Sequence, residues 1–183
     1  MLLLKRSLLL FAGLSILCGL LYPLIMTLIA QLVFPYQSNG SIVKHKEQII
    51  GSRLIGQQFT DLKYFHGRPS ATNSPYDANN SGGSNLGPTN KKFLAEVQAR
   101  VDQIRQGNAL PLNKPVPADL VLTSASGLDP HISPLSAILQ VKRIAAARDI
   151  TEDAVKRTIR LNTEQPWLGV WGKERVNVLQ LNL

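Results

Sequence analysis

Residues 7–34 read SLLLFAGLSILCGLLYPLIMTLIAQLVF, a stretch of 28 residues without a charged side chain. Its few polar residues (Ser7, Ser15, Thr27 and Gln31) do not form a polar face such as a soluble helix shows. A helix of about 20 apolar residues crosses the hydrocarbon core of a bilayer and satisfies its own backbone hydrogen bonds there. A signal peptide has a much shorter apolar core and a small-residue cleavage site. The stretch therefore predicts one transmembrane helix that is not removed.

The charges that flank this helix predict its orientation. Lys5 and Arg6 stand before it together with the α-amino group, and the first charges after it are Lys44 and Lys46. The positive-inside rule then places the N-terminus in the cytoplasm. The expected segments are a cytoplasmic N-terminus at 1–6, a transmembrane helix at 7–34 and an extracytoplasmic domain at 35–183.

Small residues give the transmembrane helix a candidate packing face in the lipid bilayer. Ala12, Ser15 and Gly19 follow one another at spacings that place them on one side of a helix. Such residues let a second helix approach closely, although they are common in any membrane helix. Pro23 lacks the N–H that would bond to the carbonyl of Gly19, so we expect a kink there.

Composition limits the chemistry of the domain. It carries 18 of the 20 Lys and Arg residues and all 12 Asp and Glu residues, a net charge of +6, with the basic residues scattered among the acidic ones. This pattern favours a solvated surface near a membrane over a nucleic-acid site. The single cysteine, Cys18, lies in the apolar stretch, which excludes an intramolecular disulfide, and the three histidines do not form a metal-binding motif. We expect no nucleic acid, no metal and no tightly bound cofactor.

The hydrophobic patterns of residues 35–183 predict an α+β fold with short strands and about three helices. Residues 41–65 are strand-like, with Gly51 and Gly56 indicating a bent or bulged pair. We expect a helix at 91–106 with Phe93, Val97, Val101 and Ile104 on its apolar face, a helix at 133–148, a helix from Thr151, and strands at 119–124 and 174–183. Asn90, Ser133 and Thr151 are the expected N-caps.

Residues 67–90 form a long polar segment, in which 16 of 24 residues are Gly, Pro, Ser or Asn. One interpretation is a flexible linker, because the segment has little apolar area to bury. The other is a partner-facing loop, because loops of this length inside a compact domain are usually functional or disordered. On the second interpretation the candidate contact residues are Arg68, Ser84, Asn85 and Gly87.

The nearest approach to a catalytic group is the sequence DPHIS, with Asp129, His131 and Ser133. These are the residue types of a hydrolase triad, and a membrane-anchored extracytoplasmic hydrolase is the alternative function. The members of a triad normally come from separate segments of the chain. Five consecutive residues cannot easily bring a serine hydroxyl and a carboxylate to opposite nitrogens of the same histidine ring. An Asp-Pro turn followed by the N-cap Ser133 explains the same residues, so we expect no catalytic residue.

Six stretches between residue 51 and residue 183 carry a family resemblance. They are GSRLIGQQF (51–59), YFHGRPSA (64–71), GGSNLGPTN (82–90), SGLDPHISP (126–134), QVKRIAAAR (140–148) and RVNVLQLNL (175–183). Together they resemble the C subunit of the Kdp potassium-transporting ATPase, the KdpC family, and they occur in the order of that family behind a single N-terminal membrane helix. One local departure is Ala125, where the family more often has Gly or Ser.

The resemblance implies a non-catalytic subunit of an ATP-driven potassium uptake pump in the bacterial inner membrane. Its implied partners are a channel-like potassium-binding subunit, a P-type ATPase subunit and a small single-span subunit. Subunits of this family are described as assembling the complex and as acting as a catalytic chaperone that raises the ATP affinity of the pump subunit. The resemblance implies that Leu54, Gly56 and Gln57 carry that role, with any ATP held through the pump subunit.

The predicted orientation constrains this role. With a cytoplasmic N-terminus, the LIGQ sequence at 54–57 lies outside the membrane, where ATP and the ATPase domains are absent. We therefore expect that the effect on ATP affinity runs through the membrane helix or through the channel-like subunit.

Overall fold

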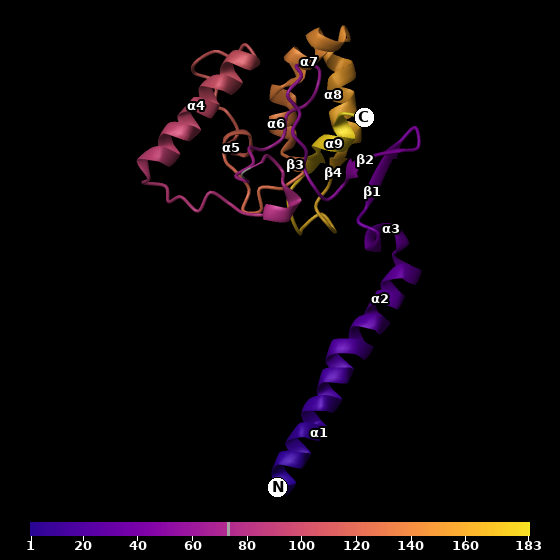
Figure 1. Cartoon of the computed structure of the whole chain (residues 1–183). Helices are drawn as coiled ribbons and strands as arrows, with labels where there is room; N and C mark the ends of the chain where they lie inside the picture. Colours follow the sequence, from indigo (N-terminus) through magenta and orange to yellow (C-terminus); the bar gives the residue numbers. More distant parts are fainter. Residues whose placement is uncertain (73) are drawn as a thin grey trace. The chain divides into compact units, whose positions relative to one another are not determined.

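The computed structural model describes residues 1–72 and 74–183 and divides them into two compact units, Met1–Ser52 and Arg53–Leu183 (Figure 1). Residue 73, which belongs to the predicted loop 67–90, lies outside the described residues.

One long apolar helix forms most of the first unit. It runs over Leu2–Val33 with a mean hydropathy of 2.3, and by length and composition it can cross a membrane. Its parts are α1 (Leu2–Ile16), a π-helical turn (Leu17–Leu21) and α2 (Tyr22–Val33). The π-helical turn ends two residues before Pro23, because the proline ring removes the backbone donor for the carbonyl of Gly19.

A hairpin follows the long helix. The short helix α3 (Pro35–Ser38) leads into the antiparallel strands β1 (Ile42–His45) and β2 (Gln48–Ser52), with an irregularity between Val43 and Lys44. Ser52 Oγ donates a hydrogen bond of 2.7 Å to the carbonyl of Gly40. The predicted bulged strand pair is thus confirmed up to Ser52. The strand prediction is wrong for 53–65, which contains no strand.

The second unit has the predicted α+β fold. Its sheet has the antiparallel order β3 (His131–Ile132), β5 (Arg175–Asn177) and β4 (Thr163–Glu164), with Ile132 and Thr163 both paired to Val176. Helices α6 (Pro134–Leu139), α7 (Val141–Arg148), α8 (Glu152–Leu161) and α9 (Val178–Leu181) lie together near this sheet (Figure 1). The most deeply buried apolar side chains of the core are Phe65, Ile132, Ile144, Ile159, Val176 and Leu181.

The helix α4 (Lys91–Gly107) begins where the sequence predicts. The side chain of Asn90 accepts hydrogen bonds from the backbone N–H groups of Lys92 and Phe93 at 2.9 and 3.2 Å. The apolar face of α4 is only half-buried, and it packs on α5 (Ala118–Val121). The caps Ser133 and Thr151 are also confirmed, because each side chain accepts from the N–H three residues on.

Three predicted elements are wrong in part. Residues 119–124 contain the helical turn α5 instead of a strand, because Leu120 and Val121 bury their side chains from a turn that follows Pro117. The helix predicted at 133–148 is interrupted at Gln140 and leaves Leu135 and Ile138 exposed. The strand predicted at 174–183 ends at Asn177, whose side chain caps α9.

Side-chain amides hold the segment around Phe65 in place of a sheet partner. Asn182 accepts from the N–H of Phe65 at 2.7 Å and donates to its carbonyl at 2.9 Å. Gln140 makes the same pair of bonds to His66, at 2.8 and 3.1 Å. These bonds satisfy the buried backbone as a strand ladder does. The junction between α6 and α7 falls at Gln140, the residue whose amide makes these bonds.

Candidate functional site

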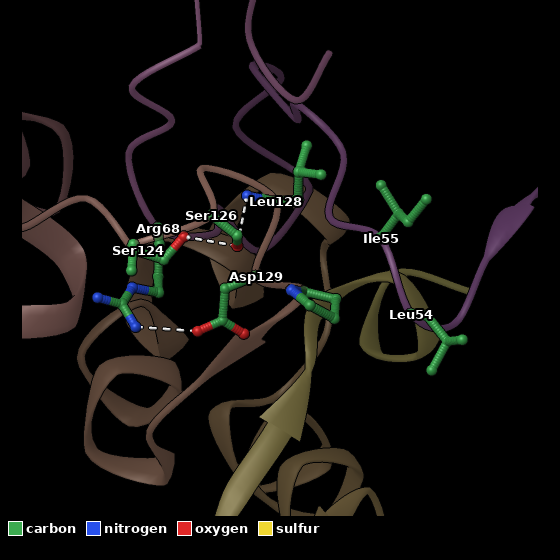
Figure 2. A pocket seen from close by; sticks show the side chains of 9 residues that line it. Leu54, Ile55, Arg68, Ser124, Ser126, Leu128 and Asp129 are labelled. Atoms are coloured by element: carbon green, nitrogen blue, oxygen red, sulfur yellow. Dashed lines mark hydrogen bonds and ion pairs between the residues drawn. The ribbon is translucent and has the colours of Figure 1, made fainter. Parts of the chain in front are cut away.

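The residues that follow Arg53 line an open pocket of about 570 Å³ (Figure 2). Leu54 and Ile55 lie on one side of this pocket, and Arg68 and Asp129 lie opposite them (Figure 2). The remaining wall is the turn at 124–130, which links α5 to β3. The pocket therefore brings together three of the stretches that carry the family resemblance.

An ion pair forms the polar side of the pocket. Arg68 Nη1 donates to Asp129 Oδ2 at 2.9 Å, and Arg68 Nη2 donates to the carbonyl of Thr123 at 3.2 Å. Burial alone would raise the pKa of Asp129, but hydrogen bonds from His131 and Arg68 outweigh it and lower the pKa to about 2. Both side chains are half-buried and are occupied with each other, so they act as a structural clamp.

The loop at 67–90 is fastened to the turn at 124–130 beside this clamp. Ser70 Oγ donates to the carbonyl of Gly127 at 2.7 Å, and the N–H of Gly82 donates to the carbonyl of Ser126 at 2.9 Å. Gly127 has a φ of +68°, and a Cβ there would lie 2.8 Å from the carbonyl oxygen of Gly82. The loop is therefore tied to the domain along its course rather than extending from it as a linker.

Gly56 is in close contact with Tyr76 from this loop. Its N–H donates to the carbonyl of Leu128 at 2.8 Å. A Cβ at Gly56 would come within 2.8 Å of Tyr76 Cδ1 and 2.9 Å of the carbonyl oxygen of Asp129, so only glycine fits without a shift. The hydroxyl of Tyr76 donates to the carbonyl of Arg68, and burial followed by the nearby Asp129 raises the pKa of Tyr76 to about 12.

Gln57 belongs to a different hollow from Leu54. It lines a groove of about 530 Å³ between the 57–70 segment and α4, together with the basic side chains Arg100 and Arg143. His66 also lines this groove, and burial followed by the charge of Arg143 lowers its pKa. The structure therefore separates the three residues of the family analogy. Leu54 lines the pocket, Gly56 packs against the ring of Tyr76, and Gln57 lines the groove.

The residues predicted to face a partner fall into two groups. Arg68 turns inward to Asp129, as described above. Asn85 and Gly87 are exposed, Ser84 is half-buried, and a Cβ at Gly87 would meet no atom within 4 Å. The outer part of the loop thus presents backbone and small side chains on the surface. In the first unit, Ala12, Ser15 and Gly19 are exposed on the long helix.

The triad required by the hydrolase alternative does not form among the described residues. Ser133 Oγ lies 2.9 Å from Ser136 Oγ and 3.3 Å from Asp119 Oδ1, so its one proton goes to this pair, and it caps α6. Asp129 does approach His131, with Oδ1 3.4 Å from Nδ1, but its other oxygen is held by Arg68. Within the described residues, no group of three or more His, Cys, Asp or Glu side chains could hold a metal ion.

Sequence reasoning missed two residues that organise this region. Tyr76 is the only aromatic residue of the loop at 67–90, and that isolation was an available signal for a buried anchor. Asp119 accepts from the N–H of Ser133 and from Ser136 Oγ, both at 2.6 Å, and thereby joins α5 to α6. No local pattern distinguishes Asp119 from a surface carboxylate.

Comparison with known proteins identifies the family. The family model described as K+-transporting ATPase, c chain (KdpC), matches residues 4–183. A potassium-transporting ATPase KdpC subunit of Burkholderia orbicola is 50% identical over 182 residues, which cover 99% of this chain and 94% of that protein. The subunits of the same name from Bradyrhizobium diazoefficiens and Caldanaerobacter subterraneus are 48% and 47% identical, covering 98% of this chain and 94% and 92% of those proteins. The chain therefore belongs to the KdpC family of potassium-transporting ATPase subunits.

Proposed function

We propose that this chain is the accessory subunit that assembles a potassium-transporting ATPase and raises the ATP affinity of its pump subunit. Its partners in this proposal are a channel-like potassium-binding subunit, a P-type ATPase subunit and a small single-span subunit. The long helix anchors the chain in the bacterial inner membrane, with the N-terminus in the cytoplasm and the second unit outside. Family membership and the apolar helix Leu2–Val33 support this assignment.

The way in which the loop at 67–90 is fastened carries the proposal. The inner half of the loop is held by the Arg68–Asp129 ion pair, by Ser70 and by Tyr76. This anchorage leaves Asn85 and Gly87 on the surface in a defined position. A preorganised polar loop can bind a partner with a smaller loss of conformational entropy than a free linker would incur. The outer loop is thus suited to contact another subunit outside the membrane.

The positions of Leu54, Gly56 and Gln57 favour an indirect effect on ATP affinity. Packing against Tyr76 and the carbonyl of Asp129 is sufficient to explain why residue 56 is glycine. Leu54 and Gln57 line separate hollows, so a nucleotide bound in one of them would not meet both side chains. In this proposal Leu54 and Gly56 support the pocket wall and the loop, Gln57 has no part in the effect, and the loop transmits the effect through the neighbouring subunit.

The experiment compares variants of this chain in the purified complex. It measures two quantities: how much of each subunit co-purifies, and the KM for ATP of the potassium-stimulated ATPase. Gly87→Arg should weaken co-purification and raise the KM. The matched control is Gly107→Arg, since a Cβ at either glycine would have no atom within 4 Å; it should change neither readout. Gln57→Ala should leave both unchanged. A raised KM for Gln57→Ala in a fully assembled complex would show that Gln57 acts on ATP binding directly.

A further inference from the structure

The segment between β4 and β5 displays a compact apolar surface. This segment, residues 166–172, reads PWLGVWG and is called the tryptophan loop below. Trp167 and Trp171 exchange backbone hydrogen bonds of 2.9 and 3.0 Å, and their rings stack with centroids 5.2 Å apart. Leu168 and Gly169 both have positive φ and turn the chain between them. The two indoles and the turn thus form an ordered tip.

The side chains of the tryptophan loop are nearly all in contact with solvent. Trp167 is 68% exposed and Trp171 is 62% exposed, and Leu168 and Val170 are 70% and 76% exposed. Elsewhere in the second unit exposed leucines such as Leu112 and Leu161 occur singly along the chain. Single exposed apolar residues are normal on a protein surface, whereas a contiguous cluster marks an interaction site. The tryptophan loop therefore needs an apolar environment to cover it.

The base of the tryptophan loop is joined to the point where the chain enters the second unit. Arg53, the first residue of this unit, forms an ion pair with Glu164 of β4, and Glu164 also binds Arg175 of β5 at 2.9 Å. Within the first unit, Ser52 is hydrogen-bonded to Gly40, two residues after α3. The chain between the apolar helix and Arg53 therefore doubles back on itself and is a short tether. A short tether gives the loop a high effective concentration at the membrane that the helix enters.

The chemistry of the tryptophan loop matches the boundary between headgroups and acyl chains. Tryptophan is enriched at this boundary because its ring is apolar and its N–H is polar. The charges beside the loop nearly balance, since Arg53, Lys173 and Arg175 are offset by Glu164 and Glu174 and leave a net charge of only +1. Anionic lipid is therefore not required, and apolar burial is the driving force. We propose that the tryptophan loop inserts into the interfacial region of the bilayer in which the chain is anchored.

The experiment measures tryptophan fluorescence of the full chain reconstituted in vesicles of zwitterionic phosphatidylcholine. The two tryptophans of the loop are the only ones in the protein, so the emission reports on this loop alone. Their emission should shift to shorter wavelength relative to the urea-unfolded chain. Phosphatidylcholine brominated near the headgroup end of the acyl chains should quench it more strongly than lipid brominated near the chain ends. Replacing part of the lipid with phosphatidylglycerol, or raising the salt concentration, should not change the quenching.

Matched variants separate insertion from mere proximity to the membrane. Leu168→Ser with Val170→Ser keeps both reporters and should lose most of the quenching, whereas Leu112→Ser should retain it. Because the proposal rests on the helix being a membrane anchor, flotation of the chain with the vesicles is measured separately.

Three results would overturn the proposal for a chain that floats with the vesicles. The first is emission typical of water without quenching by brominated lipid. The second is a blue shift that varies with the ratio of protein to lipid, which indicates a second copy of the chain. The third is a blue shift that appears only on addition of the other pump subunits, which indicates a protein partner.

Discussion

Substitution of Gly56 by alanine tests the packing of the pocket wall. The new methyl group would lie 2.8 Å from Tyr76 Cδ1 and 2.9 Å from the carbonyl oxygen of Asp129. Overpacking of this kind costs about 1–3 kcal/mol. Strain on the hydrogen bond from Gly56 to Leu128 adds about 0.5–1 kcal/mol. Alanine has fewer backbone conformations than glycine in the unfolded chain, and this offsets about 0.4–1 kcal/mol of the loss in stability. We therefore expect Gly56→Ala to lower the free energy of unfolding by about 1–3 kcal/mol.

A double-mutant cycle isolates the contact with the tyrosine ring. Tyr76→Ala removes the ring and its hydrogen bond to Arg68 but also removes the clash with a methyl group at residue 56. The destabilisation of the double variant should therefore be smaller than the sum of the single effects by about 1 kcal/mol. Gly87→Ala is the matched control, because its Cβ would meet no atom within 4 Å. It should be neutral or slightly stabilising.

Pulse proteolysis of the full chain in detergent, at increasing urea concentration, measures these differences. The protease cuts the unfolded domain, so the surviving fraction gives the midpoint of unfolding for each variant. If Gly56→Ala is as stable as Gly87→Ala, or if the cycle is additive within about 0.5 kcal/mol, the contact between Gly56 and Tyr76 does not have the proposed importance.

Three further predictions concern the clamp, the core and the anchor. The pKa of Asp129 falls from 3.8 to about 2 on folding, so its carboxylate stabilises the fold above pH 3.8 and this contribution is lost as the pH falls toward 2. The loss in urea midpoint should correspond to less than about 2 kcal/mol, since the side chain is partly solvated, and Asp129→Asn should abolish this pH dependence. Asn182→Ala leaves the backbone of Phe65 without two partners and should cost about 2–4 kcal/mol by the same assay; an unchanged midpoint would contradict the amide clamp. Gly19→Leu should reduce co-purification of the chain with its complex, and full recovery would leave the long helix as a simple tether.

Local patterns in the sequence were sufficient for the long apolar helix and for the helix starts. The apolar stretch at 7–34 needs no partner to be recognised, because its length and lack of charge can be read from the sequence alone. Asn90, Ser133 and Thr151 were predicted as caps because a cap bonds to N–H groups two or three residues away. These features depend on neighbours in the sequence.

Features that depend on distant partners were missed. The helix at 133–148 breaks at Gln140, whose amide binds the backbone of His66, and no local signal marks that contact. Residues 53–65 have strand-like composition but lack a strand partner, and side chains such as Asn182 and Arg143 bind their carbonyls instead. The candidate site has the same character, since Gly56 meets Tyr76 across a polar loop that resembles a linker in sequence.

The central claim is that the second unit lies outside the membrane and acts on ATP affinity without touching ATP. The test places a cysteine in the exposed loop by Asn85→Cys, in a chain whose single native cysteine has been removed by Cys18→Ser. A maleimide that cannot cross the inner membrane is then added to intact bacterial cells. We predict that the cysteine is labelled without opening the inner membrane. Labelling that appears only after the membrane is opened would place the loop in the cytoplasm and contradict the proposed topology.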